Sequence, residues 1–105
     1  MKVKDIIKEY LILTIETKTD NTLIPNYLLV SNITKYARYK YDKFVSEESV
    51  SRIWREYREL LKTVDYNSDK AYIFKYNDKK HLLVKKEIKR ILYFSIIKNY
   101  MEEIC

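Results

Sequence analysis

The sequence predicts a single α+β domain that is mostly helical. Three observations predict it: apolar residues recur at helical spacing over long stretches, a pair of β-rich runs follows them, and a chain of 105 residues suits one modest core but not two. The apolar fraction of 47% is too high for a disordered chain. We therefore expect one domain spanning residues 1–105.

The first half of the chain predicts two helical regions. Apolar residues share one helix face over residues 2–17. Residues 23–24 form a candidate short strand before Pro25, which suits the first turn of a helix. The second helical region covers residues 25–43, and the Ser-Asn pair at residues 31–32 predicts a fresh start within it because either side chain can cap a helix.

The clearest boundary is the start of the helix predicted over residues 47–62. Ser46 fits the N-cap, because its hydroxyl can accept a hydrogen bond from a free backbone N–H in the first turn. Val45 and Val50 occupy the positions of a hydrophobic staple. The expected buried stripe contains Val50, Ile53, Trp54, Tyr57, Leu60 and Leu61. The residues expected largely away from this stripe include Arg52, Arg55 and Arg58.

Directly after the third predicted helix, apolar residues no longer recur at helical spacing. Residues 63–70 are predicted to form a polar loop. Residues 71–85 predict a hairpin whose turn holds Asn77 and Asp78, the non-glycine residue types that best tolerate positive φ. The tail, residues 87–104, is predicted as an apolar helix, and its apolar residues cover too much of the circumference for one core-facing stripe.

Several functional classes are not expected from this sequence. The absence of glycine excludes the glycine-dependent nucleotide-binding loops, and one histidine with the terminal Cys105 leaves no set of metal ligands. We expect no enzyme activity, no cofactor and no small-molecule ligand. A signal peptide and a membrane-spanning stretch are not expected either, which favours the cytoplasm, or the host cytoplasm if the chain is viral.

Positive charge is concentrated in two segments of the chain, whose formal net charge is +6. Residues 31–45 contain four basic residues and one acidic residue, and residues 69–90 contain eight basic and three acidic residues. Lysine and arginine are the residues that hold nucleic-acid phosphates. The clustering therefore favours an anionic partner such as double-stranded DNA.

The order helix, helix, helix, hairpin, helix resembles a winged helix-turn-helix domain. The likeness covers residues 23–85, with Ala37 at the small-residue position of the helix crossing, and with Val50 and Ile53 where the second helix of the motif packs back on the first. The connection from Tyr39 to Val45 is longer than the tight prokaryotic turn and has no glycine. The composition, with eleven tyrosines, is similar to that of small regulators of hyperthermophilic archaea and their viruses.

This resemblance implies a dimeric, sequence-specific protein that binds double-stranded DNA and regulates transcription. The helix after Ser46 would read base edges in the major groove, while its flanks would hold phosphates. The candidate DNA-binding residues of the recognition helix are Ser49, Ser51, Arg52 and Arg55. The candidates on the preceding helix are Lys35, Arg38, Lys40 and Lys43. The candidates on the wing are Lys75, Lys79 and Lys80.

The apolar tail helix implies a homodimer, because its hydrophobic surface would otherwise be exposed. The expected interface residues are Ile91, Phe94, Ile97, Tyr100, Met101, Ile104 and Cys105. Cys105 would form an intermolecular disulfide or remain a free thiol. The alternative function is a winged-helix-like protein interaction module, in which the third helix and the tail bind proteins and nucleic-acid binding is weak or non-specific. For the arginines of the third helix, the alternative to DNA contact is pairing with neighbouring glutamates along a solvated helix.

Overall fold

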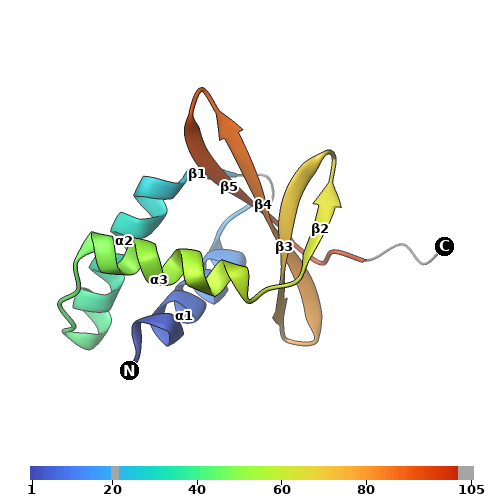
Figure 1. Cartoon of the computed structure of the whole chain (residues 1–105). Helices are drawn as coiled ribbons and strands as arrows, with labels where there is room; N and C mark the ends of the chain where they lie inside the picture. The colour runs from blue at the N-terminus through green and yellow to red at the C-terminus, as the bar shows by residue number, and fades with distance from the viewer. Residues whose placement is uncertain (20–21, 102–105) are drawn as a thin grey trace.

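Three helices cover one face of a five-stranded antiparallel sheet in the computed structural model, which describes residues 1–19 and 22–101 (Figure 1). The helices are α1 (Val3–Thr17), α2 (Asn26–Tyr41) and α3 (Glu47–Glu59). The strands are β1 (Leu23–Pro25), β2 (Thr63–Tyr66), β3 (Asp69–Tyr76), β4 (Lys79–Ile88) and β5 (Ile91–Ile97). Their order in the sheet is β1-β5-β4-β3-β2. The α+β class is confirmed, but the chain is not mostly helical, because strands occupy most of its second half.

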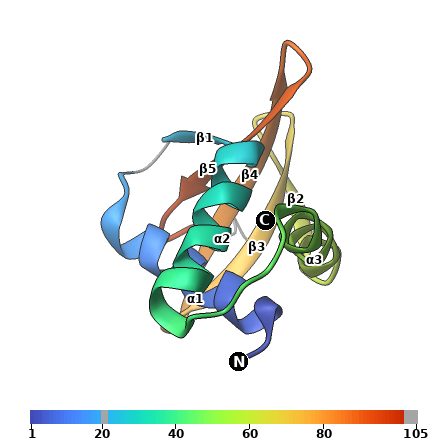
Figure 2. The same ribbon diagram turned by 90° about the vertical axis from the view of Figure 1, so that its left-hand side faces the viewer.

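The main core lies between the helices and the covered face of the sheet, and Figure 2 shows α1 and α2 in front of the sheet. Trp54 of α3 is fully buried, and its ring meets that of Phe94 of β5 edge-on at 5.4 Å between centroids. The Trp54 indole N–H donates to Asn26 Oδ1 at 2.9 Å, which fixes the start of α2 against α3. The opposite face of the sheet has a smaller buried cluster of Ala71, Ile73, Leu82 and Val84.

The helix boundaries agree with the local signals, with two exceptions. Ser46 Oγ accepts a hydrogen bond from the Ser49 N–H at 3.1 Å, which confirms the predicted N-cap. Because α3 ends at Glu59, Leu60 leaves the buried stripe and is 69% exposed. The second exception is that α2 is continuous through residues 31–32. A helix that has already formed extends one residue at a time without the cost of forming a new first turn, so no second start is needed here.

Two predictions for the second half of the chain are wrong. Residues 63–70 form β2 and the start of β3 instead of a loop. Residues 87–97 form the end of β4, a turn and β5 instead of a helix. Phe94 faces the helix-covered core, whereas Ile97 packs against the opposite cluster. Apolar side chains on all sides of this segment therefore suit a strand that is buried on both faces.

All three hairpins turn through two residues at positive φ without any glycine. These pairs are Asn67–Ser68, Asn77–Asp78 and Lys89–Arg90. Positive φ at both central residues defines the type I′ turn, which matches the twist of the flanking strands. The Asn77–Asp78 turn is the one that the sequence predicts. Lys89 and Arg90 have φ values of 51° and 67°, where side chains of their size are disfavoured.

The residues predicted at a dimer interface do not share one surface. Phe94 is buried beneath the helices, and Ile97 and Tyr100 pack against the cluster on the opposite face of the sheet. Two of the predicted residues are exposed, at 41% and 85%, namely Ile91 and Met101. The other two lie outside the described residues, namely Ile104 and Cys105. The dimer prediction rested on a helix over residues 87–104, and residues 87–97 form strands and a turn instead.

Glu9 connects α1 to α2 through a network of hydrogen bonds. Its Oε1 accepts from the Tyr36 hydroxyl at 2.7 Å and from the Lys40 ammonium, and its Oε2 accepts from the Tyr41 hydroxyl. The hydrogen bond from Lys40, followed by those from Tyr41 and Tyr36, lowers the pKa of Glu9 from 4.5 to about 2. The carboxylate is therefore ionised at neutral pH and holds the two helices together.

We expect Glu9→Gln to lower the free energy of unfolding by about 1 kcal/mol at pH 7, because a neutral amide is a weaker acceptor and the network is partly exposed. Since folding depresses the pKa of Glu9, its stabilisation is present above pH 4.5 and is lost as the pH falls toward 2. Urea titrations between pH 7 and pH 3 measure this effect. Glu56→Gln, which alters an exposed pair with Arg52, is the control. A difference from wild type that did not shrink with pH would contradict this role of Glu9.

Candidate nucleic-acid interface

The two ends of β4 present separate groups of basic residues. Figure 1 shows the β3–β4 turn and the β4–β5 turn at opposite ends of the sheet. Because β4 has ten residues, these turns are about 30 Å apart. The predicted wing residues belong to the β3–β4 end, namely Lys75, Lys79 and Lys80.

The β3–β4 end lies beside α1 and the end of α3. Lys75 and Lys80 line a pocket together with Leu60, which directly follows α3. The Tyr76 hydroxyl donates a hydrogen bond to Glu16 of α1. The predicted wing residues are therefore separated from the first turns of α3, where the sequence places the recognition residues.

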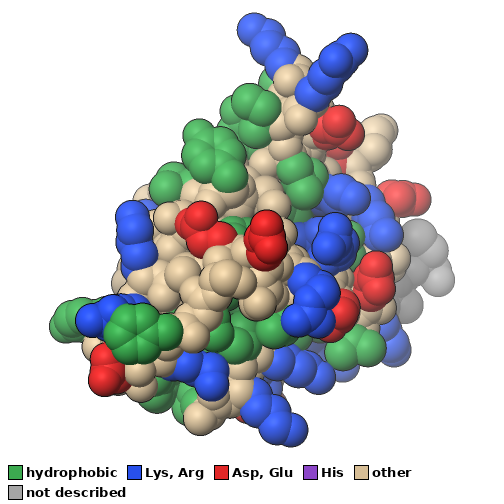
Figure 3. All heavy atoms as spheres, turned by 60° about the vertical axis from the view of Figure 1, so that its left-hand side comes forward, with side chains coloured by type: hydrophobic (Ala, Val, Ile, Leu, Met, Phe, Trp, Pro, Cys, Tyr) green, Lys and Arg blue, Asp and Glu red, His purple; other side chains and the backbone are tan. Residues whose placement is uncertain are grey.

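The β4–β5 hairpin has the more prominent basic tip. Lys89 and Arg90 are both exposed, with half-buried Lys85 and Lys86 behind them. In the space-filling view, Lys and Arg side chains occupy the end of the upper projection (Figure 3). Lys86 Nζ lies 3.8 Å from an Asp69 carboxylate oxygen, so the positive charge near this turn is only partly balanced.

The helices lie against the base of the same hairpin. Pro25, which directly precedes α2, pairs with Tyr93 of β5. Trp54 of α3 packs on Phe94, the next residue of β5. Arg90 lies four positions before Phe94, so the tip reaches about 13 Å beyond the row of the sheet that α3 contacts. The base of the β4–β5 hairpin thus packs against α3 in the core and pairs with the residue that precedes α2.

The predicted recognition residues differ in exposure. The two that are exposed are Arg52 and Arg55. The two that are half-buried are Ser49 and Ser51. Arg52 pairs with Glu56 at 3.6 Å, while Ser51 and Arg55 line a groove of about 470 Å³ with Tyr27 at the start of α2. Ser51 and Arg55 are therefore the predicted recognition residues that share a groove with the start of α2.

Arg58 is buried, contrary to its predicted position on the exposed side of the helix. It is 7% exposed, and its guanidinium carbon lies 4.8 Å from the ring centroid of Trp54 and 4.9 Å from that of Phe94. Its Nε and Nη1 donors have no hydrogen-bond partner among the described residues. Burial, together with the nearby positive charge of Arg55, lowers the pKa of Arg58. A buried cation thus lies beneath the exposed arginines of α3.

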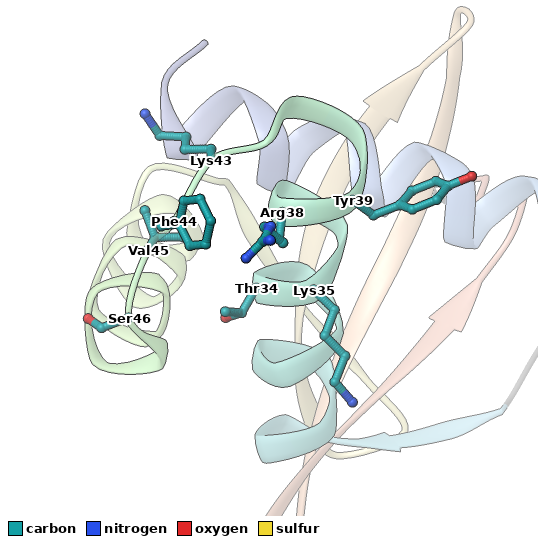
Figure 4. A pocket seen from close by; sticks show the side chains of 8 residues that line it. All are labelled: Thr34, Lys35, Arg38, Tyr39, Lys43, Phe44, Val45 and Ser46. Carbon is teal, nitrogen blue, oxygen red and sulfur yellow. The ribbon is translucent and has the colours of Figure 1, made fainter.

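Three of the four basic residues predicted on helix 2 line one groove. Arg38 faces Phe44 across a groove of about 690 Å³ between α2 and the segment that leads to α3, with the guanidinium carbon 3.9 Å from the ring centroid (Figure 4). Lys35 and Lys43 line the same groove, and their side chains extend in opposite directions (Figure 4). Lys40 belongs to the network between α1 and α2. The structure therefore brings Lys35, Arg38 and Lys43 to one groove and places Lys40 in a separate network.

The sequence-based candidates omit the basic residues of the β4–β5 hairpin, namely Lys85, Lys86, Lys89 and Arg90. A Lys-Arg pair contains none of the residue types that mark a turn. One signal was nevertheless present, because the run Ile91–Ile97 is rich in β-branched and aromatic residues, which favour strands. The helix predicted over residues 87–104 covers this turn, so the sequence did not predict a hairpin here.

Comparison of the chain with protein-family models, curated proteins and solved structures gave no match. No helix within residues 1–19 or 22–101 is long and apolar enough to cross a bilayer. In the same part of the chain, no three His, Cys, Asp or Glu residues are grouped so that they could hold a metal ion. The geometry and charge of the molecule are therefore the basis for a functional assignment.

Proposed function

We propose that this protein binds double-stranded DNA as a winged helix, with α3 in the major groove and the β4–β5 hairpin as the wing. The order of the elements and the contact of α3 with the base of this hairpin support the proposal. The exposed Arg52 and Arg55 would reach base edges, and the hairpin tip would hold phosphates beside them. The dimer is not part of this proposal, because it rested on a tail helix and residues 91–97 of that segment form a strand.

The observation that carries the proposal is the Lys89–Arg90 turn. Both residues adopt positive φ in a two-residue turn that favours Asn and Gly, at a conformational cost of about 1 kcal/mol each. Both side chains are exposed, so packing does not account for them. Backbone strain of this kind is often located at functional sites. A turn that maintains two exposed cations at this cost suits contact with DNA phosphates.

A second candidate function rests on the charge of α3. This helix contains four glutamates and three arginines, and one of the arginines is the buried Arg58. Its exposed surface is thus net negative, which suits a protein partner of complementary charge better than a phosphate backbone. The alternative is therefore a protein interaction module that binds nucleic acid weakly.

The salt dependence of duplex binding distinguishes these two functions. We expect the logarithm of the association constant to fall with the logarithm of salt concentration with a slope of about −3 to −5, because a few arginines and lysines of α3 and the wing would each neutralise one phosphate. Fluorescence anisotropy with a labelled 25-base-pair duplex of random sequence measures this slope. If no duplex binding is detected at 50 mM salt, the DNA-binding proposal is wrong and the interaction module remains.

A further inference from the structure

A basic pocket lies at the β3–β4 end of the sheet, away from the proposed wing. Its volume is about 380 Å³, and it is bounded by α1, the end of α3 and the sheet. Four separate segments of the chain each contribute one lysine to its lining, namely Lys8, Lys62, Lys75 and Lys80. Among the described residues, no aspartate or glutamate lines it. The pocket therefore gathers positive charge from residues that are distant in sequence.

The pocket opens beside an unpaired part of the sheet. The pairing of β2 with β3 ends at Tyr72, and the Ile73 N–H donates to the Lys62 carbonyl at 2.8 Å. Beyond this hydrogen bond, no described strand pairs with the outer edge of β3 at Phe74 and Lys75. The space beside this edge is therefore left open to a ligand.

The apolar residues of the lining are also suited to a ligand. Tyr57 and Phe74 are almost fully buried and form part of the wall, whereas Leu60 is 69% exposed at its rim. An apolar body that covered Leu60 would gain free energy by removing this surface from water. The volume of the pocket lies within the range of small-molecule sites, about 300–1,000 Å³.

We propose that this pocket binds a small dianionic phosphate ester with a flat apolar body, of the class of aryl phosphates and nucleoside monophosphates. The lysines attract the phosphate, since several like charges around one pocket are stabilised by a dianion. Leu60 packs against the apolar body. The sequence predicts no small-molecule ligand, because the four lysines come together only in the fold. The proposal does not depend on DNA binding.

Phenyl phosphate is the probe for this site, with inorganic phosphate as a probe of charge alone. We expect phenyl phosphate to bind about tenfold more tightly, because the ring buries apolar surface that inorganic phosphate lacks. The full-length protein is titrated with each compound, and the NMR shifts of the Leu60 and Leu61 methyl groups are followed. Leu60→Ala should reduce the preference for phenyl phosphate at least threefold.

Two variants that each remove two positive charges separate the pocket from the wing. Lys62→Ala/Lys75→Ala should weaken phenyl phosphate binding at least fivefold, whereas Lys89→Asn/Arg90→Gly should leave it unchanged. Duplex binding is measured on the same proteins, so failure of the pocket and failure of the DNA-binding proposal are distinguishable. The pocket proposal is overturned if the methyl groups do not shift at 10 mM phenyl phosphate. It is also overturned if both double variants weaken phenyl phosphate binding equally, which would indicate attraction by net charge alone.

Discussion

Lys89→Asn/Arg90→Gly should weaken duplex binding more than tenfold at 0.1 M salt and make the salt slope less steep by about two, because two phosphate contacts are lost. Asn-Gly is the preferred sequence for a type I′ turn, so the hairpin should be at least as stable as in the wild type. A loss of binding would therefore reflect the missing charges and not unfolding. Anisotropy titrations at several salt concentrations, together with thermal unfolding, measure both effects.

Lys75→Ala/Lys79→Ala is the matched control for this variant. It removes the same charge from the β3–β4 end of the sheet, about 30 Å from the proposed wing tip. We expect the affinity for duplex to change less than threefold, through net charge alone. If only this control lost affinity, the wing predicted from the sequence would be right and its placement at β4–β5 would be wrong. Equal losses would argue against any wing.

The start of α3 could be predicted from the sequence because its signals are local. Ser46 caps a backbone N–H only three residues away, so no distant part of the chain has to be known. The β3–β4 turn was predictable for the same reason, since Asn77 and Asp78 tolerate positive φ by themselves. The order of the three helices and of the β3–β4 hairpin followed from such local preferences, whereas β2 did not.

The tail could not be predicted in this way, because its apolar residues fit both a helix and a strand. A strand buried on both faces shows no alternation, so a short apolar run does not reveal its period. The pairing of Ile91–Ile97 with β4 and with β1 decides the structure, and β1 lies some seventy residues earlier in the chain. Missing this pairing left the β4–β5 hairpin out of the candidate wing and suggested a dimer interface where there is a strand.

Arg58 was misplaced because its partners are also distant in sequence. The sequence predicts one buried stripe on α3, and Arg58 is outside it. Tyr72 and Phe94 from the sheet nevertheless lie within 6.0 Å and 4.9 Å of its guanidinium carbon, so the buried side of the helix is wider than its apolar residues indicate. An arginine can be buried against the faces of aromatic rings. The spacing of apolar residues in the sequence does not indicate such a contact.

Arg58→Met should raise the free energy of unfolding by about 1–2 kcal/mol. The guanidinium is buried with two donors unpaired, and each such donor costs about 1–3 kcal/mol, in addition to the desolvation of the charge. Its stacking on the rings contributes about 2 kcal/mol at a desolvated site, which offsets only part of this cost. Methionine fills a similar space and makes favourable contacts with aromatic rings. Urea and thermal unfolding measure the difference.

Arg58→Ala separates the effect of charge from that of packing. It removes the same charge but leaves a cavity beside Trp54 and Phe94, so it should lower the free energy of unfolding by about 2 kcal/mol. If Arg58→Met were as unstable as Arg58→Ala, ring stacking would outweigh desolvation and the expected gain would be wrong. A methionine variant that is more stable but binds duplex two- to threefold more weakly would indicate a functional role for the charge. It would mean that Arg58 offsets the four glutamates of α3 at the expense of stability.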